Sequence, residues 1–342
     1  MERLFGTLMD LVAVESVTGN EDSYGEALAR HLGALGFDVE RQQVAPGRHN
    51  LLARTGMPEV VFCTHLDTVP PFFGPSEDAE FVHGRGSCDA KGPALAMIEA
   101  ARALLAEGED RIGFLFTVGE EIDSVGACRA NERLAEPWRP AFTIVGEPTG
   151  NRFVRAHKGI FKATLAAEGV AGHSSQDVGP SAVHELVRAL GGLLAEDWGT
   201  HPVLGPGTLN VGLIRGGLAP NVVADRAEAS LLLRAVEGPE RTEERMRRHL
   251  SPHVHLHPAE AGYGPVDFDL PEGVDETEAI TVAFGTDAPY LGRWGRPLLY
   301  GPGHILDAHT DHERLSKRSF EKAVVEYHRT ARALLAQSGA RA

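Results

Sequence analysis

The feature that most constrains the fold is the segment Thr64-His65-Leu66-Asp67-Thr68-Val69-Pro70, which follows the apolar run Val60–Cys63. A short run of β-forming residues closed by proline predicts a buried strand. His65 and Asp67 are two residues apart, so an extended chain points both side chains to the same face. Open α/β sheets bind their ligands at the carboxyl ends of their strands. The pattern therefore places an imidazole and a carboxylate at a binding edge.

The sequence on either side of this segment predicts an α/β fold with a mostly parallel sheet flanked by helices. Residues 1–40 have two helical apolar stripes separated by a break at Ser16–Asn20, and a further helix is expected at Pro93–Leu105. Strands that alternate with helices are typical of βαβ units. The expected strands are Val39–Val44, Asn50–Ala53, Val60–Cys63, Ile112–Val118 and Ala141–Val145.

The pattern changes after residue 158 and returns to α/β signals near residue 263. Between these points the order of elements is βαββαβ, which predicts a ferredoxin-like domain inserted into the first one. We therefore expect a discontinuous domain of residues 1–158 and 263–342, with residues 159–262 as the insertion. The elements expected in the insertion are Phe161–Val170, Ser181–Ala195, Thr208–Ile214, Ala227–Ala235, Glu240–Leu250 and Val254–Pro258; those after it are Ile280–Phe284, Pro297–Tyr300 and Ser319–Leu335.

Composition excludes several classes of function. The formal net charge of −15 argues against nucleic-acid binding, because phosphate contacts need Lys and Arg. No basic segment followed by an apolar one resembles a signal peptide, and no apolar run is long enough to span a bilayer. The three widely spaced cysteines predict neither a disulfide framework nor a cysteine-based zinc site. We expect a cytoplasmic protein that binds neither nucleic acid nor membranes.

Carboxylates and histidines recur at the ends of the expected strands and in the loops between them. Besides His65 and Asp67, these residues are Asp89, Glu120, Glu121, Glu147 and His309. This set of side chains suits a divalent ion such as zinc, cobalt or manganese. A two-metal hydrolase needs a bridging carboxylate and one further carboxylate that acts as base, and the chain supplies both types.

Other histidines and a cysteine compete with this set. His304 and His312 flank His309, and Cys88 precedes Asp89. The alternating His253, His255 and His257 also invite a metal-site interpretation. We favour a solvated strand face for the alternating histidines and a packing role for Cys88.

Five motifs in order make the chain resemble the di-zinc aminoacylase and carboxypeptidase family. This family includes acetylornithine deacetylase, succinyl-diaminopimelate desuccinylase, glutamate carboxypeptidase and related dipeptidases. The motifs are His65–Pro70, Gly84-Arg85-Gly86 through Asp89-Ala90-Lys91-Gly92, Gly119-Glu120-Glu121, Gly146-Glu147-Pro148-Thr149, and Ala308-His309-Thr310 with Glu313.

The resemblance implies a role for each residue of these motifs. His65 and Glu147 would bind one metal ion, Glu121 and His309 the other, and Asp89 would bridge them. Glu120 would act as general base, and Asp67 would orient His65. The cofactors implied are two divalent ions, with zinc expected and cobalt or manganese as alternatives. The Asp89–Ala90 peptide bond is expected to be cis.

The resemblance extends to the insertion, which would act as a lid or dimerisation domain. His173 in Gly172-His173-Ser174-Ser175 would reach a substrate oxyanion. Asn221 and Arg234 would bind the substrate carboxylate, and Arg suits a bidentate contact of this kind. Gly303, near the end of the chain, is also expected to contact the substrate. The chain departs from the family pattern at Leu232 and Ala224.

These features predict a metal-dependent amide hydrolase. The segment Gly301-Pro302-Gly303 followed by Ala308-His309 resembles the acetylornithine deacetylase and lysine-biosynthesis branch, so deacylation of an N-acyl amino acid such as acetylornithine is the main prediction. The alternatives are a dipeptidase, an aminopeptidase or a succinyl-diaminopimelate desuccinylase with the same metals, and a catalytically dead amino-acid-binding protein. The expected partners are a small substrate and a second copy of the chain.

Overall fold

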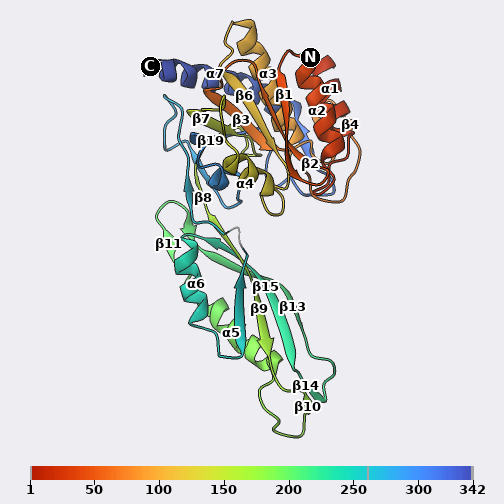
Figure 1. Ribbon diagram of the computed structural model, residues 1–342, viewed down its shortest axis with the longest axis vertical. Coiled ribbons are helices and arrows are strands. Elements are labelled where there is room, and N and C mark those ends of the chain that lie inside the picture. Colours follow the sequence, from red (N-terminus) through yellow and green to blue (C-terminus); the bar gives the residue numbers. More distant parts are fainter. Residues whose placement is uncertain (1, 260–261, 340–342) are drawn as a thin grey trace. The chain divides into compact units, whose positions relative to one another are not determined.

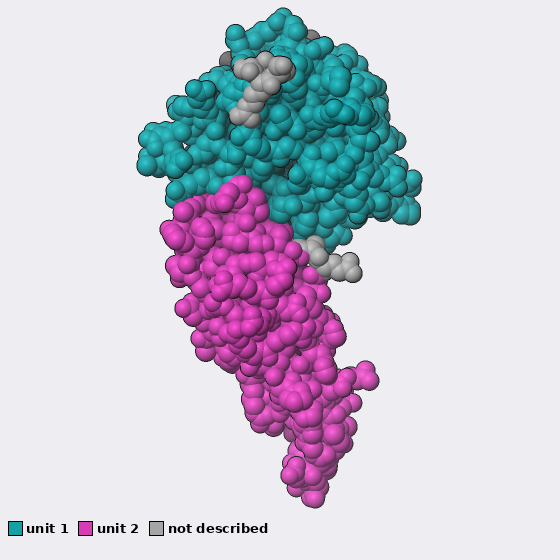
Figure 2. All heavy atoms as spheres, turned by 60° about the vertical axis from the view of Figure 1, so that its left-hand side comes forward, with its two compact units in different colours: residues 1–155, 268–280, 286–342 teal, residues 156–267, 281–285 magenta. Residues whose placement is uncertain are grey.

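The structure, a computed structural model, describes residues 2–259 and 262–339. By its internal contacts the chain divides into two compact units, which Figure 2 colours separately. Unit 1 comprises Met1–Arg155, Phe268–Ile280 and Thr286–Ala342, and unit 2 comprises Ala156–Asp267 and Thr281–Gly285. Each unit has its own apolar core.

The main sheet has the strand order β1-β2-β6-β3-β7-β19-β8-β17, with β18 paired to β8 (Figure 1). The neighbours β6, β3, β7 and β19 run parallel, and antiparallel strands extend the sheet on both sides. The strands are β1 (Asp38–Ala45), β2 (Arg48–Arg54), β3 (Val60–His65), β6 (Ile112–Thr117), β7 (Phe142–Val145), β8 (Val154–His157), β17 (Val266–Asp267), β18 (Ile280–Val282) and β19 (Arg296–Leu299).

The central strands are buried on both faces, which explains their continuous apolar sequences. One face packs into a core shared by α1, α2, α3 and α7, and the other contacts residues of α4. The helices are α1 (Glu2–Val12), α2 (Asp22–Ala34), α3 (Lys91–Ala106), α4 (Val125–Glu132) and α7 (Lys317–Gly339), with a 3₁₀ turn η1 (Ala288–Tyr290). A small sheet pairs β5 (Phe81–His83) with both β4 (Ser76–Glu77) and β20 (Arg314–Ser316).

Unit 2 has the predicted βαββαβ order. Its sheet runs β13-β15-β9-β16, and alternate residues of β9 and β15 are buried against a core that includes residues of α5 and α6. The elements are β9 (Gly159–Glu168), β10 (Gly172–His173), α5 (Ala182–Ala195), β11 (Thr200–His201), β12 (Gly205–Pro206), β13 (Thr208–Gly216), β14 (Val222–Val223), β15 (Arg226–Ala235), α6 (Pro239–Arg247) and β16 (Val254–Pro258).

The predicted mixed α/β fold with helices flanking its sheet is confirmed, whereas some boundaries differ. Residues 1–40 form two helices and the start of β1, and α4 and β8 were not predicted. Residues 156–158, 263–267 and 281–285, predicted with the catalytic domain, are grouped with unit 2. The reason is local pairing, because Tyr263 exchanges backbone hydrogen bonds with Ile160, and Lys158 donates to the Val282 carbonyl.

No helix within the described ranges is long and apolar enough to cross a membrane.

Candidate metal centre

The carboxyl ends of the parallel strands bring the predicted ligands to one edge of the main sheet. His65 is the last residue of β3, Glu120 and Glu121 follow β6, and Glu147 follows β7. Asp89 lies in the loop before α3, and His309 lies in the loop before β20. Parallel strands end at a common edge, so the side chains that follow them gather there.

The side chains of His65, Asp89, Glu121 and His309 lie close together. His65 Nε2 is 3.0 Å from Asp89 Oδ1, and His309 Nε2 is 3.2 Å from Asp89 Oδ2 and 3.0 Å from Glu121 Oε2. One ligand atom each from His65, Asp89 and Glu121 fall within 4.8 Å of one another. Asp89 thus turns one oxygen to each imidazole, as expected of a carboxylate that bridges two cations.

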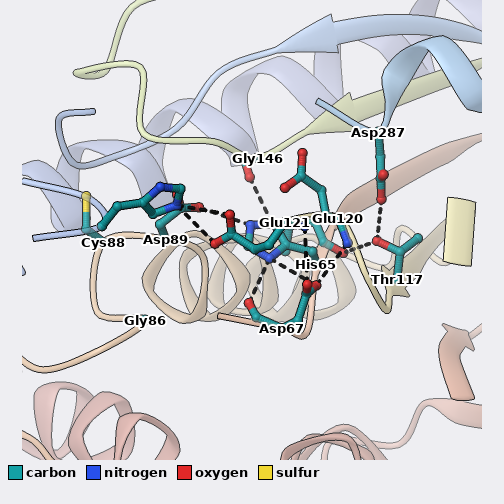
Figure 3. Close-up of polar contacts among 12 residues, drawn as sticks. His65, Asp67, Gly86, Cys88, Asp89, Thr117, Glu120, Glu121, Gly146 and Asp287 are labelled. Carbon is teal, nitrogen blue, oxygen red and sulfur yellow. Dashed lines mark hydrogen bonds and ion pairs between the residues drawn. The ribbon is translucent and has the colours of Figure 1, made fainter. Parts of the chain in front are cut away.

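Asp67 holds the loop that carries Glu120 and Glu121. Its Oδ1 accepts hydrogen bonds from the backbone N–H groups of Gly119 and Glu120, both at 3.1 Å, and its Oδ2 accepts from that of Glu121 at 3.2 Å. His65 Nδ1 lies 2.9 Å from the Asp67 carbonyl oxygen but 3.6 Å from the carboxylate. Asp67 therefore orients His65 mainly through the Asp67 carbonyl oxygen, whereas the Asp67 carboxylate accepts hydrogen bonds from the loop (Figure 3).

Glu120 and Glu147 complete the group of acidic side chains. Glu147 is buried, and Glu120 keeps part of its surface exposed. Removal from water raises the pKa of both carboxyl groups well above the usual range. The charge of Glu147 adds to the effect on the pKa of Glu120, and the charge of Asp89 adds to that on the pKa of Glu147. A carboxyl group with a raised pKa is suited to accept and return a proton near neutral pH.

The residues present fit divalent metal ions. Burial disfavours the charged form of Asp89, yet its hydrogen bonds to His309 and His65 hold its pKa below the usual range. Hydrogen bonds to Asp89 and Glu121 raise the pKa of His309 to about 10. The site therefore binds positive charge strongly at both imidazoles. Two divalent cations carry four positive charges. They would balance the four carboxylates of Asp89, Glu120, Glu121 and Glu147.

Three polar residues near the centre, Glu313, Arg85 and Asp287, were given no role by the sequence. Glu313 accepts backbone hydrogen bonds from the loop of Asp89 and pairs with Arg85 at 2.6 Å. Asp287 accepts a 2.6 Å hydrogen bond from Thr117 Oγ1, and burial raises its pKa to about 6. Figure 3 shows Asp287 and Asp89 on opposite sides of His65. Glu313 belongs to a recognised motif, whereas nothing in the sequence around Asp287 marks it as a site residue.

The residues predicted to contact the substrate lie in both units. Gly303 is buried at a φ of +83°, and a Cβ there would lie 2.5 Å from Cys88 Sγ, so close packing requires glycine. His173, Asn221 and Arg234 belong to unit 2, and their roles in substrate binding stay predictions. His173 Nδ1 lies 2.8 Å from Ser175 Oγ.

The side chains of the competing histidines have other partners or are exposed. His312 pairs with Asp311 at 2.6 Å, and His304 Nδ1 accepts the N–H of Leu306. His255 and His257 are exposed on β16, and His253 is exposed just before it; His255 lies 4.0 Å from Glu168. Within the described ranges, the group of ligand atoms close enough to hold a metal ion is that of His65, Asp89 and Glu121. The Asp89–Ala90 peptide is cis, as the resemblance implied.

Comparison with known proteins identifies the family. A model described as Peptidase family M20/M25/M40 matches residues 61–333. A peptidase M20 domain-containing protein of Schizosaccharomyces pombe is 36% identical over 326 residues, which is 91% of this chain and 80% of that protein. A probable carboxypeptidase of Aspergillus flavus is 36% identical over 377 residues, which cover 95% of this chain and 88% of the Aspergillus protein.

Solved structures support the same fold. The crystal structure of a tripeptidase from Staphylococcus aureus has a TM-score of 0.81 at 22% identity, covering 97% of this chain and 98% of its own. The chain therefore belongs to peptidase family M20/M25/M40 and is a metal-dependent hydrolase of peptide or other amide bonds. These comparisons give no specific support to the acetylornithine deacetylase branch.

Proposed function

We propose that this member of the M20/M25/M40 family is a two-metal carboxypeptidase that releases the C-terminal amino acid from short peptides. The observation that carries the proposal is the placement of Asp89, with one oxygen toward His65 and the other toward His309 and Glu121. Carboxypeptidase names among the relatives favour peptide substrates over acetylornithine. The tripeptidase name of a structural neighbour favours short ones.

The ligands divide into two groups around Asp89. His65 with Glu147 would hold one divalent ion, His309 with Glu121 the other, and Asp89 both. Zinc is the expected metal, since two histidines and several carboxylates suit it. When bound, the ions would supply Lewis acidity that polarises the amide carbonyl and makes water more acidic.

Glu120 is the proposed proton carrier. Its raised pKa lets its carboxylate accept a proton from water and then deliver that proton to the departing amine nitrogen. Asp67 fixes the backbone at both Glu120 and Glu121, so the proposed base and the proposed ligand keep the same position relative to each other. A general acid–base of this kind contributes about 10²- to 10⁴-fold to rate.

Residues of unit 2 are proposed to bind the substrate. Arg234 would contact the α-carboxylate of the C-terminal residue in the bidentate manner that guanidinium groups favour, with Asn221 beside it. His173 would donate to the oxygen that becomes negative during attack. A homodimer through unit 2 remains part of the proposal, as does a small-molecule substrate.

Deacylation of an N-acyl amino acid is the second candidate. It rests on the segment Gly301-Pro302-Gly303 with Ala308-His309, and the reaction is chemically close to the first. Both reactions cleave an amide bond whose nitrogen belongs to an amino acid with a free α-carboxylate. The two candidates differ only in the group on the acyl side, which is a peptide or a small acid.

The test is hydrolysis by protein reconstituted with zinc or cobalt. The substrates are an N-blocked dipeptide, a dipeptide amide, a free dipeptide, a free tripeptide, N-acetylornithine and N-succinyl-diaminopimelate, with Glu120→Gln as the inactive control. A carboxypeptidase cleaves the N-blocked dipeptide and spares the amide, whereas an aminopeptidase does the reverse. Cleavage of N-acetylornithine alone would replace the first candidate by the second. Metal binding without any turnover would refute both.

A further inference from the structure

The loop that carries Asp89 is held by one buried carboxylate, that of Glu313. Glu313 Oε1 accepts the backbone N–H groups of Gly86, Cys88 and Asp89, each at 3.0 Å. The Glu313 side chain is fully buried. Three N–H groups that converge on one anion form a backbone nest of the type that binds phosphates and other anions. Here the anion is part of the protein, so the loop has a fixed shape.

The second oxygen of the same carboxylate is tied to the same loop. Arg85 Nη1 donates to Glu313 Oε2 at 2.6 Å, and Gly84 N–H donates to the Glu313 carbonyl at 3.0 Å. Arg85 also donates through Nε to the Pro71 carbonyl, and its guanidinium lies 5.0 Å from the centre of the Phe73 ring. The positive charge of Arg85 offsets the negative charge of Glu313. This clamp, made of Glu313 and Arg85, therefore adds little net charge to the metal centre.

Strand pairing brings Glu313 to this position. β20 begins at Arg314 and pairs with β5, with Arg314 opposite His83. The Asp89 loop leaves β5 just after His83, so Glu313 meets the loop where β5 ends and β20 begins. His309 lies only four residues before Glu313. The clamp therefore ties the segment of one proposed ligand to the loop of another, although Asp89 and His309 are far apart in the sequence.

We propose that Glu313 is a positioning residue that fixes the bridging carboxylate Asp89 against His309 and so sets the affinity of the metal centre. This inference rests on the two-metal function proposed above. A bridging ligand must present both oxygens in fixed directions, and a loop of this length would otherwise move. Loss of such an outer-sphere partner lowers metal affinity or activity by about 10- to 100-fold.

Two variants separate positioning from general stability. Glu313→Gln keeps an oxygen that can accept the three N–H groups but loses the charge that pairs with Arg85. Glu313→Ala removes both functions. Glu237→Gln is the control, because Glu237 pairs with Arg245 at 3.2 Å in unit 2, which carries none of the proposed metal ligands.

The experiment measures zinc affinity by competition with a chelating dye, starting from metal-free full-length protein. The visible spectrum of the cobalt-loaded protein then reports coordination geometry, and thermal unfolding without metal reports stability. We expect zinc affinity about 10-fold weaker in Glu313→Gln and 10- to 100-fold weaker in Glu313→Ala, with an altered cobalt spectrum. Hydrolysis by Glu313→Gln should recover as zinc is raised, and the control should match wild type.

The outcomes distinguish the two proposals. Unchanged zinc affinity and cobalt spectrum in both variants would overturn the inference even if their unfolding temperatures fell, since Glu313 would then be only structural. If Glu313→Ala does not fold, Glu313→Gln alone decides between these results. Wild-type protein that binds no metal would refute the proposed function together with the inference, whereas wild-type binding and turnover with unaffected variants would refute the inference alone.

Discussion

Replacing Asp67 by asparagine should destabilise the loop that carries Glu120 and Glu121 and lower activity. The carboxylate of Asp67 accepts three backbone N–H groups of the loop from Gly119 to Glu121, and Oδ2 also accepts the hydroxyl of Thr18 at 2.9 Å. Asparagine has nearly the same shape but offers one acceptor oxygen and one NH₂ group. The NH₂ group of asparagine must therefore face at least one backbone N–H group of the loop, so that two donors lie against each other.

The magnitude follows from these contacts. If the amide oxygen takes the Oδ1 position, it still accepts from Gly119 and Glu120, while the NH₂ group faces the N–H of Glu121. An unsatisfied buried N–H costs about 1–3 kcal/mol. The two retained hydrogen bonds lose their charge assistance, at about 1 kcal/mol each. The total is about 3–5 kcal/mol, or an unfolding temperature lower by about 6–20 °C for a unit of this size.

Activity should fall as well, because Glu120 and Glu121 share the displaced loop. A shift of about 1 Å in a catalytic group costs about 10²-fold in rate, so we expect kcat/KM to fall by at least that factor. The assay combines thermal unfolding of the metal-free protein with hydrolysis of the substrate that the panel identifies. Asp287→Asn is the matched control, since Asp287 is equally buried but takes its 2.6 Å hydrogen bond from the Thr117 hydroxyl, which asparagine can also accept.

One result would refute this reasoning. If Asp67→Asn unfolds within about 1 kcal/mol of wild type while Asp287→Asn is equally or more damaging, the backbone hydrogen bonds of Asp67 do not hold the loop. Loss of activity without loss of stability would instead indicate that Asp67 acts through His65.

Three further predictions concern metal removal, packing and acid stability. Chelation should abolish hydrolysis and remove about 3 kcal/mol of stability for each of the two ions, relative to protein with metal at 100 times its Kd. Adding zinc should restore both, and full activity in chelator would contradict a metal enzyme. Gly303→Ala should cost about 2–5 kcal/mol in denaturant unfolding, from its φ of +83° and the contact with Cys88, whereas Gly191→Ala in α5 meets no atom within 4 Å and should be neutral or stabilising. Burial lowers the pKa of His157 to about 4, so the unfolded chain binds a proton below pH 6.5 that the folded chain binds only near pH 4. Stability should therefore be complete above pH 6.5 and fall by about 3 kcal/mol toward pH 4, and an equal acid loss in His157→Gln would contradict this assignment.

The position of His65, Glu121 and Glu147 at one edge of the sheet could be predicted because these residues follow apolar strands whose period and length are clear. Val60–Cys63 and Ile112–Val118 could be recognised as buried strands, and a sheet with parallel neighbours then dictates where His65 and Glu121 meet. β8 and α4 were missed because Val154–His157 is short and mixed in polarity, and α4 has only eight residues. Such short elements are fixed by tertiary contacts more than by local pattern.

The supporting residues could not be predicted for a different reason. Glu313 stood in a recognised motif, but three of the four donors to its carboxylate are backbone N–H groups, which no side-chain pattern marks. Asp287 meets Thr117 across 170 residues of sequence, and only the fold brings them together. Sequence patterns record which side chains carry chemistry, whereas the orientation of those side chains depends on contacts formed after folding.

Asp67 and Glu313 solve the same physical problem at two loops. A loop that carries a metal ligand has backbone N–H groups that no helix or sheet satisfies, and buried N–H groups need acceptors. At each loop, one buried carboxylate accepts three of these groups. A neutral acceptor could satisfy the hydrogen bonds less strongly, since a charged acceptor contributes about twice as much. The Glu313 carboxylate is itself offset by the guanidinium of Arg85. The protein can thus hold both loops rigidly while leaving the charge of Asp89 and Glu121 for the proposed metal ions.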